Sequence, residues 1–148
     1  YLYRSLSGNV PDGYYTTEVG KAALACEGNE LSIITYGLGV HWALEAIDEL
    51  GISADVLDLR TLLPWDKEAV AETTRKTNRV LVLHEDCLTG GIGGEISAWI
   101  GEHCFEHLDA PVMREASLDT PVPFAKALEE NFLPKSRLKT KIQALMAY

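Results

Sequence analysis

The sequence predicts an α/β fold, a three-layer αβα sandwich on a mostly parallel sheet of about four to five strands. Short runs of Val, Ile and Leu alternate with stretches in which apolar residues recur at helical spacing. Glycine or proline separates most of these segments, and 148 residues suit a single hydrophobic core. Because strand and helix alternate, we expect parallel strands, helices on both faces of the sheet and right-handed crossovers.

The first strand is expected at Leu31–Tyr36, a short β-branched apolar run that Gly37 ends. A helix should follow, because apolar residues recur at helical spacing from Val40 to Leu50. Gly51 then supplies a residue that readily adopts the left-handed conformation in which helices commonly end.

The same unit then repeats. Ala54–Leu59 is expected to be a strand, and the next helix should run from about Asp66 to Lys76, with the Asp66 side chain as its N-cap. Arg79–Leu83 gives the clearest strand pattern in the sequence. After it, His84–Thr89 is expected to form a loop.

The second half of the chain is also expected to contain both helices and a strand. The glycine-rich segment Gly90–Gly94 leads into a helix that we expect to continue from Ile92 to His107. Pro111–Glu115 is predicted to be a fourth strand, and Phe124–Asn131 a short helix after two prolines. A final amphipathic helix, capped by Ser136, should run through Leu145.

Residues 1–30 differ from the rest of the chain, because no sustained period runs through them. We expect residues 1–30 to form an irregular surface arm and residues 31–148 to form the α/β domain. Since the chain starts at Tyr1 and not at Met, we expect it to be part of a longer protein, although a processed start would look the same. The arm would then lie along a neighbouring domain and be loosely held.

Charge argues against two classes of partner. The formal net charge of -9 disfavours a general nucleic-acid or anionic-membrane binder, because both functions need a positive surface. The acidic body nevertheless ends in a basic tail: no acid follows Glu130, whereas four cations do, Lys135, Arg137, Lys139 and Lys141. The tail can lie against the acidic body, or the body can receive a basic partner.

Neither export nor membrane insertion is indicated. No stretch of about 18 consecutive apolar residues is present, and the start of the chain has no basic segment followed by an apolar one. The three cysteines, Cys26, Cys87 and Cys104, are odd in number and widely spaced. We therefore expect free thiols and a cytoplasmic location.

Gly37-Leu38-Gly39 lies between a strand and a helix, and Asp58 ends the next strand, which is almost a dinucleotide-binding fingerprint. However, Trp42 stands where that fingerprint has its third glycine. A tight strand-to-helix turn is therefore the favoured interpretation of this segment.

Gly90–Gly94 has the composition of an anion-binding loop at a helix N-terminus. No Lys-Ser or Lys-Thr follows it, and Glu95 in the first turn would repel an anion. The glycines are therefore predicted to allow close approach of another chain segment and to begin the helix.

A metal site is disfavoured as well. His103, Cys104 and His107 lie within about one helical turn, and His84 and Cys87 share a loop, but their spacing fits no zinc motif. No nucleophile motif is present either. The residues alone therefore favour no catalytic, cofactor-binding or metal-binding site in this chain.

Five blocks together resemble, in order and spacing, the C-terminal domain of the beta subunit of thiamine-diphosphate-dependent 2-oxoacid dehydrogenases, within the transketolase superfamily. They are Ile34–Gly37, Asp58–Asp66, His84–Glu85, Leu88–Ile96, and Asp109–Val112 followed by Asp119–Pro121. The likeness spans essentially the whole chain, and residues 1–22 are similar to the linker that follows a pyrimidine-binding domain. The variants Pro64-Trp65-Asp66, His84-Glu85 and Leu88-Thr89-Gly90-Gly91 are similar to branched-chain, 2-oxoisovalerate-type enzymes.

The resemblance implies an oxidoreductase that decarboxylates a 2-oxoacid and transfers the acyl group to a lipoyl disulfide. In that family the alpha part holds the diphosphate and magnesium, and a glutamate of the pyrimidine-binding domain activates the cofactor. It therefore implies that thiamine diphosphate and magnesium bind outside this chain, and that the chain alone is inactive.

The resemblance also implies partners: other domains or subunits of the dehydrogenase, and the basic subunit-binding domain of a dihydrolipoyl acyltransferase. Expected interface or docking residues are Gly90, Gly91, Gly93, Gly94, Asp109 and Tyr148. An alternative of a different class stays open. It is a free-standing small α/β protein that binds a nucleotide or an anion at the Gly37 turn or the Gly90 loop.

Overall fold

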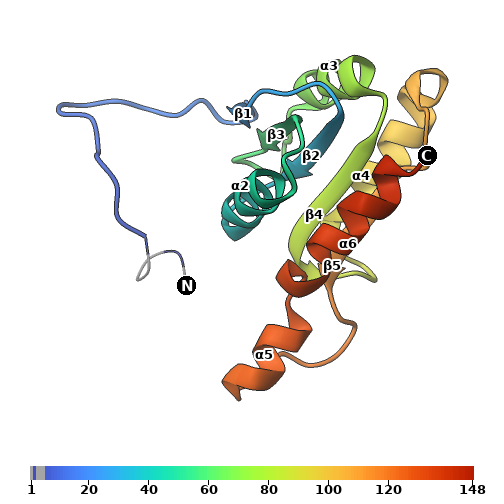
Figure 1. The fold of residues 1–148 in the computed structure, drawn as a ribbon. Coiled ribbons are helices and arrows are strands. Elements are labelled where there is room, and N and C mark those ends of the chain that lie inside the picture. The colour runs from blue at the N-terminus through green and yellow to red at the C-terminus, as the bar shows by residue number, and fades with distance from the viewer. Residues whose placement is uncertain (1, 3–5) are drawn as a thin grey trace.

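The computed structural model describes residue 2 and residues 6–148, so the start of the predicted arm, at residues 1 and 3–5, lies outside the described residues. The described part forms a five-stranded sheet in the order β1-β3-β2-β4-β5 (Figure 1). The strands β2, β3, β4 and β5 run parallel, and β1 pairs antiparallel with β3 at one edge. The predicted mostly parallel α/β fold is thus confirmed. Strand bounds are β1 (Ala23–Cys26), β2 (Leu31–Thr35), β3 (Ala54–Asp58), β4 (Val80–Cys87) and β5 (Met113–Ser117).

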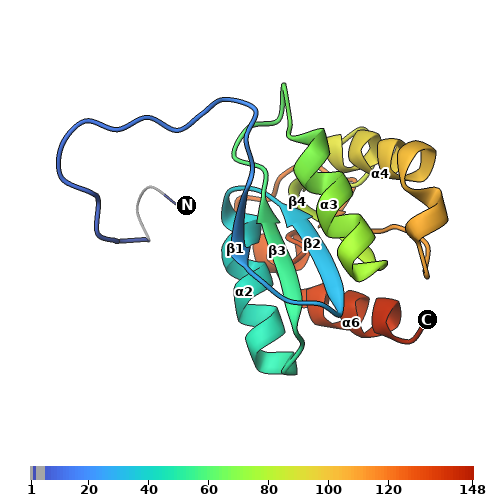
Figure 2. The same ribbon diagram turned by 90° about the horizontal axis from the view of Figure 1, so that it is seen from above.

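Helices cover both faces of the sheet. Figure 2 shows α2 and α6 on one face and α3 and α4 on the other. Side chains of β4 alternate accordingly: Leu81 and Leu83 pack with the α2 and α6 cluster, whereas Val80 and Val82 pack with the α3 and α4 cluster. Helix bounds are α2 (Leu38–Leu50), α3 (Lys67–Thr77), α4 (Ile92–His103), α5 (Lys126–Phe132) and α6 (Lys135–Met146). Within the described residues no helix is both long and apolar enough to span a bilayer.

Two predicted helix boundaries are confirmed by their side chains and backbone. The Asp66 carboxylate accepts a hydrogen bond from the Ala69 N–H, as an N-cap should. Gly51 ends α2 with φ 65°, a left-handed conformation that a residue with a Cβ adopts at a cost.

The predicted loop at His84–Thr89 is wrong for its first four residues. Strand β4 continues through Cys87, which pairs with Ser117 of β5. The sequence pattern stops at Leu83 because His84 is polar, yet the His84 side chain is buried. Burial against α4, and not apolar character, keeps this position in the sheet.

Other boundaries shift for local reasons. Helix α4 ends at His103, and Phe105–His107 forms a separate 3-10 turn. Strand β5 begins at Met113 and not at Pro111, which has no N–H to donate to a neighbouring strand. Ser136 is not a cap, because Pro134, whose φ of -70° already suits a helix, occupies the position before α6.

Strand β1 lies inside residues 1–30, where no strand was expected. The Gly20 N–H donates to Thr61 Oγ1 at 2.9 Å, and the Ala22 N–H donates to Asp66 Oδ2 at 3.1 Å. Residues 20–26 are therefore attached to the α/β domain. Residues 6–19 run away from the body (Figure 1), whereas the Leu2 side chain packs against the cluster of α2 and α6. The role of this arm as a linker along another domain stays a prediction.

Candidate functional site: the two sides of helix α4

The inner side of α4 lies on the end of β4, with the His84 ring between them. His84 is fully buried and follows Val80 and Val82 on the same face of β4. A Cβ on Gly91 would meet the ring carbon Cε1 at 2.5 Å, and a Cβ on Gly93 would meet the ring nitrogen Nε2. Glycine is required at both positions because the imidazole fills the space that a side chain would need.

This histidine is electrostatically unusual. Neither ring nitrogen has a hydrogen-bond partner among the described residues. Burial lowers the pKa of His84 below its usual value; Asp86 acts in the opposite direction, and Arg114 adds to the decrease. The ring is therefore neutral at physiological pH.

The loop between β4 and α4 is fixed by the chain itself. Thr89 donates from its N–H and its hydroxyl to the Asp119 carboxylate, at 2.8 and 2.6 Å, and these two bonds lower the pKa of Asp119. Arg114 Nη1 donates to the Leu88 carbonyl oxygen at 3.0 Å. With His84 beneath Gly91 and Gly93, the loop offers no free space on that side for an anion.

The outer side of α4 borders a groove of about 770 Å³, which we name the α4 groove. The helix contributes small residues, so the groove comes close to its backbone. Three of the predicted docking residues, Gly94, Asp109 and Tyr148, meet here although they are far apart in sequence. The lining comprises Gly94, Ser97, Ala98, Gly101, Phe105, Leu108, Asp109, Ala110, Pro111, Val112, Arg114 and Tyr148.

Gly90, Gly91 and Gly93 are not among the residues that line the α4 groove. Gly91 and Gly93 are turned toward His84, and no other atoms lie within 4 Å of where a Gly90 Cβ would be. A docking role for these three glycines stays a prediction. Such a role can act through the placement of α4, because the two inner glycines determine how closely the helix approaches β4.

Asp109 is held at the rim by backbone contacts. Its N–H donates to the Asn78 carbonyl oxygen at 2.9 Å, and the Asn78 side-chain amide donates to the His107 carbonyl oxygen at 2.6 Å. No cation pairs with the exposed Asp109 carboxylate within the part of the chain that the structure describes. Beside it, Phe105 and Tyr148 are 76% and 64% exposed. A groove that is lined by an exposed carboxylate and two exposed aromatic rings suits a basic protein partner.

Sequence reasoning missed a second exposed feature, the apolar segment, defined as Leu118, Val122, Phe124 and Leu128. Val122 and Leu128 are 66% and 60% exposed, and Phe124 is fully exposed. The segment follows β5 and includes α5, which projects from the body in Figure 1. Its signal in the sequence is weak, because the apolar residues are separated by prolines and charged residues.

The sites that the sequence analysis disfavoured are filled or dispersed. A Cβ on Gly39 would meet the Thr35 hydroxyl, and Trp42 is buried. His103 stacks on the Trp99 ring and donates from Nδ1 to the Trp99 carbonyl oxygen at 2.9 Å, whereas Cys104 is buried. Among the described residues, no three His, Cys, Asp or Glu side chains are placed to hold a metal ion.

Comparison with known proteins identifies one family model and several similar proteins. Residues 20–137 match the family model described as the transketolase C-terminal domain. The 2-oxoisovalerate dehydrogenase subunit beta of Bacillus subtilis is 47% identical over 135 residues, which cover 88% of this chain and 41% of that protein. The pyruvate dehydrogenase E1 component subunit beta of the same organism is 45% identical over 139 residues, which cover 92% of this chain and 42% of that protein. The chain thus spans about two fifths of these relatives.

Among solved structures, a split-gene transketolase described as an inactive beta4 tetramer superposes with a TM-score of 0.75. It is 28% identical to this chain in sequence. The match covers 94% of this chain and 45% of the transketolase chain.

The contact of His84 with the first turn of α4 predicts the effect of added methyl groups. Gly93→Ala and Gly91→Ala should each lower the free energy of unfolding by about 1 to 3 kcal/mol, as overpacked cores do. Gly101→Ala, in the same helix with no atom within 4 Å of its Cβ position, should instead stabilise by about 0.5 to 1 kcal/mol. Urea unfolding of the three variants measures this. Equal stabilities for Gly93→Ala and Gly101→Ala would contradict the assignment.

The lowered pKa of His84 predicts acid sensitivity. Between its folded pKa and the usual value of about 6.5, the unfolded chain binds more protons than the folded chain. The free energy of unfolding should therefore decrease as the pH falls below about 6.5. Above this pH the contribution of the neutral His84 ring to stability should be complete. His84→Phe, which keeps a ring without a titrating group, should flatten this dependence, and His41→Gln at an exposed position of α2 should not. Urea unfolding over this pH range decides it, and parallel profiles for all three proteins would refute the role of His84.

Proposed function

The chain belongs to the transketolase C-terminal domain family, and from this premise we propose that it is the assembly and partner-docking domain of the decarboxylating component of a 2-oxoacid dehydrogenase complex. Its relatives include beta subunits of 2-oxoisovalerate and pyruvate dehydrogenases, which supports membership of such an enzyme. The proposed reaction of the whole enzyme is oxidative decarboxylation of a 2-oxoacid, with acyl transfer to a lipoyl group.

The observation that carries this proposal is the apolar segment. Phe124, Val122 and Leu128 lie exposed on a projecting loop and helix, where their hydration is unfavourable. Isolated apolar side chains are common on surfaces, but a set gathered on one projection indicates a contact with another protein part. We propose that another domain or subunit of the dehydrogenase covers it.

The α4 groove is the proposed site for the subunit-binding domain of a dihydrolipoyl acyltransferase. Asp109 and Tyr148 would pair with basic groups of that domain, and Gly94 would let it approach the helix backbone. Gly90, Gly91 and Gly93 would contribute by fixing the start of α4. A basic partner complements the net charge of -9.

Thiamine diphosphate and magnesium would supply the decarboxylation chemistry of the full enzyme. The residues of this chain do not fit them. His84 fills the space beside Gly91 and Gly93, Glu95 lies in the first turn of α4, and no three potential ligands are grouped among the described residues. We therefore propose that both are bound by other parts of the enzyme.

The substrate is proposed to be a branched-chain 2-oxoacid. The support is the set of sequence variants around Pro64-Trp65-Asp66 and Leu88-Thr89. A cytoplasmic location is proposed from the free cysteines.

The docking proposal predicts a selective loss of acyltransferase binding. In the assembled enzyme, Asp109→Ala should weaken binding by about 2 to 5 kcal/mol if the carboxylate is paired and desolvated in the complex. Extension of the chain beyond Tyr148 should weaken binding as well, whereas Asp48→Ala on α2 should not. Decarboxylation of free substrate should be unchanged. Surface plasmon resonance at low and high salt measures this, and unchanged affinity in both variants would place the docking face elsewhere.

The cofactor proposal predicts that the chain alone is inactive. With thiamine diphosphate and magnesium present, it should decarboxylate neither 3-methyl-2-oxobutanoate nor pyruvate. The assembled enzyme, as the positive control, should turn over 3-methyl-2-oxobutanoate faster than pyruvate. Cofactor-dependent carbon dioxide release by the chain alone would overturn the first statement, and faster turnover of pyruvate would overturn the second.

A further inference from the structure

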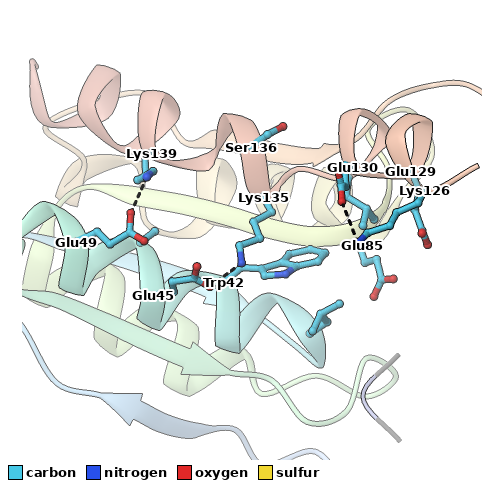
Figure 3. A pocket seen from close by; sticks show the side chains of 13 residues that line it. Trp42, Glu45, Glu49, Glu85, Lys126, Glu129, Glu130, Lys135, Ser136 and Lys139 are labelled. Carbon is cyan, nitrogen blue, oxygen red and sulfur yellow. Dashed lines mark hydrogen bonds and ion pairs between the residues drawn. The ribbon is translucent and has the colours of Figure 1, made fainter. Parts of the chain in front are cut away.

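A second groove lies on the other face of the sheet from α4. It has a volume of about 570 Å³ and is bordered by helices α2, α5 and α6 (Figure 3). We name it the Trp42 groove. Nothing in the proposed function uses it. Its lining comprises Leu38, Trp42, Glu45, Ala46, Glu49, Glu85, Lys126, Glu129, Glu130, Leu133, Lys135, Ser136 and Lys139.

The bottom of the Trp42 groove is apolar. Leu38, Trp42 and Ala46 come from successive turns of α2, and Leu133 comes from the connection between α5 and α6. Although Trp42 is only 6% exposed, its indole lies along the groove in Figure 3. Leu38, Trp42 and Ala46 are four residues apart and form a row along one side of α2. The apolar side chains of a second helix can pack against such a row.

One wall of the groove is charged but internally neutralised. Lys135 reaches Glu45 at 2.7 Å, and Lys139 reaches Glu49 at 2.6 Å, so the two pairs join α6 to α2. The hydrogen bond with Lys139 lowers the pKa of Glu49, and the same bond raises the pKa of Lys139. Each of these lysines therefore already has a carboxylate partner within the chain.

The opposite end of the groove carries uncompensated negative charge. Lys126 lies 3.9 Å from Glu130 on α5, but neither Glu85 nor Glu129 has a cationic partner within the described residues. Glu85 comes from the end of β4 and Glu129 from α5. An occupant that satisfies both must bring positive charge to this end and apolar groups to the bottom.

We propose that the Trp42 groove docks an amphipathic helix of a partner protein, with its apolar side on Trp42 and a lysine or arginine between Glu85 and Glu129. An apolar bottom with a charged rim is the anatomy of a protein interface, whereas pockets for small molecules have few charged groups. Three bordering helices suit helix-in-groove recognition through side chains at i, i+3, i+4 and i+7.

This second docking face goes beyond the proposed function. It lies across the sheet from the α4 groove, so two partners can be held at once. The exposed residues of α5 give it a further rationale. Only Phe132 of α5 is buried, so a helix in the Trp42 groove would support α5 from the side of Glu129.

The test uses the full chain labelled with nitrogen-15 and two short helical probe peptides. Both probes carry leucines at i, i+3, i+4 and i+7; one has lysines at its other positions and the second has glutamates. The indole N–H signals of the three tryptophans report the binding position. We expect the lysine probe to shift the Trp42 signal at low salt, and the Trp65 and Trp99 signals to stay unchanged. The glutamate probe should bind at least about tenfold more weakly.

Matched variants test the charge assignment. The double variant Glu85→Lys and Glu129→Lys should weaken binding of the lysine probe about tenfold or more. The double variant Glu72→Lys and Glu102→Lys, which makes the same change in net charge at exposed positions of α3 and α4, should not. All substituted positions are on the surface, so the variants should stay folded. A dispersed nitrogen-15 spectrum of each variant checks this. Equal affinity for the two probes, shifts at Trp65 or Trp99 in place of Trp42, or no effect of the Glu85→Lys and Glu129→Lys double variant would each overturn the proposal. A Trp42 shift that depends on protein concentration without a probe would assign the groove to a second copy instead.

Discussion

The position of the first turn of α4 depends on one contact, the His84 ring against the backbone of Gly91 and Gly93. The ring occupies the volume that side chains at these two positions would fill, so any residue larger than glycine there must displace the ring or the start of α4. The contact does more than fill space. It determines how high α4 sits above the sheet, and thereby where Gly94 and Gly101 present their backbone to the α4 groove.

The buried His84 ring fits the space beneath α4, but it lacks hydrogen bonds there. Neither nitrogen of His84 is satisfied within the described residues, which costs free energy that a smaller apolar residue would not cost. The opposite solution appears at Asp55, which is equally buried. Burial alone would raise its pKa, but bonds from the Gly28 N–H, Lys76 and Thr73 lower it, so the carboxylate stays ionised. One buried polar group therefore fixes α3 and the segment after β1 through hydrogen bonds, and the other fixes α4 through packing.

The sequence was informative where one local signal determines the structure. The β-branched run at Leu31–Tyr36 predicted a strand that the structure ends one residue earlier, at Thr35, and the cap at Asp66 and the glycine at Gly51 predicted their helix boundaries correctly. Prediction from the sequence failed where contacts between residues far apart in the chain determine the local structure. His84 reads as a loop residue until α4 is placed over it, and β1 is an edge strand whose pairing with β3 has no periodic pattern of its own. The grouping of Gly94, Asp109 and Tyr148 in one groove likewise depends on the tertiary fold.

The helices that border the two grooves and carry the apolar segment differ in how extensively they pack against the rest of the chain. The α4 groove rests on a helix packed against the sheet through Ile96 and Ile100, which are fully buried. Helix α5 has seven residues, too few to be stable in water by propensity alone, and packs inward only through Phe132. Binding to the folded form stabilises whatever it contacts, so partners that cover the apolar segment and Glu129 would order α5 most, while α4 needs no such help. If both faces dock partners as proposed, one rests on a helix packed against the sheet and the other on a short helix that a partner would order.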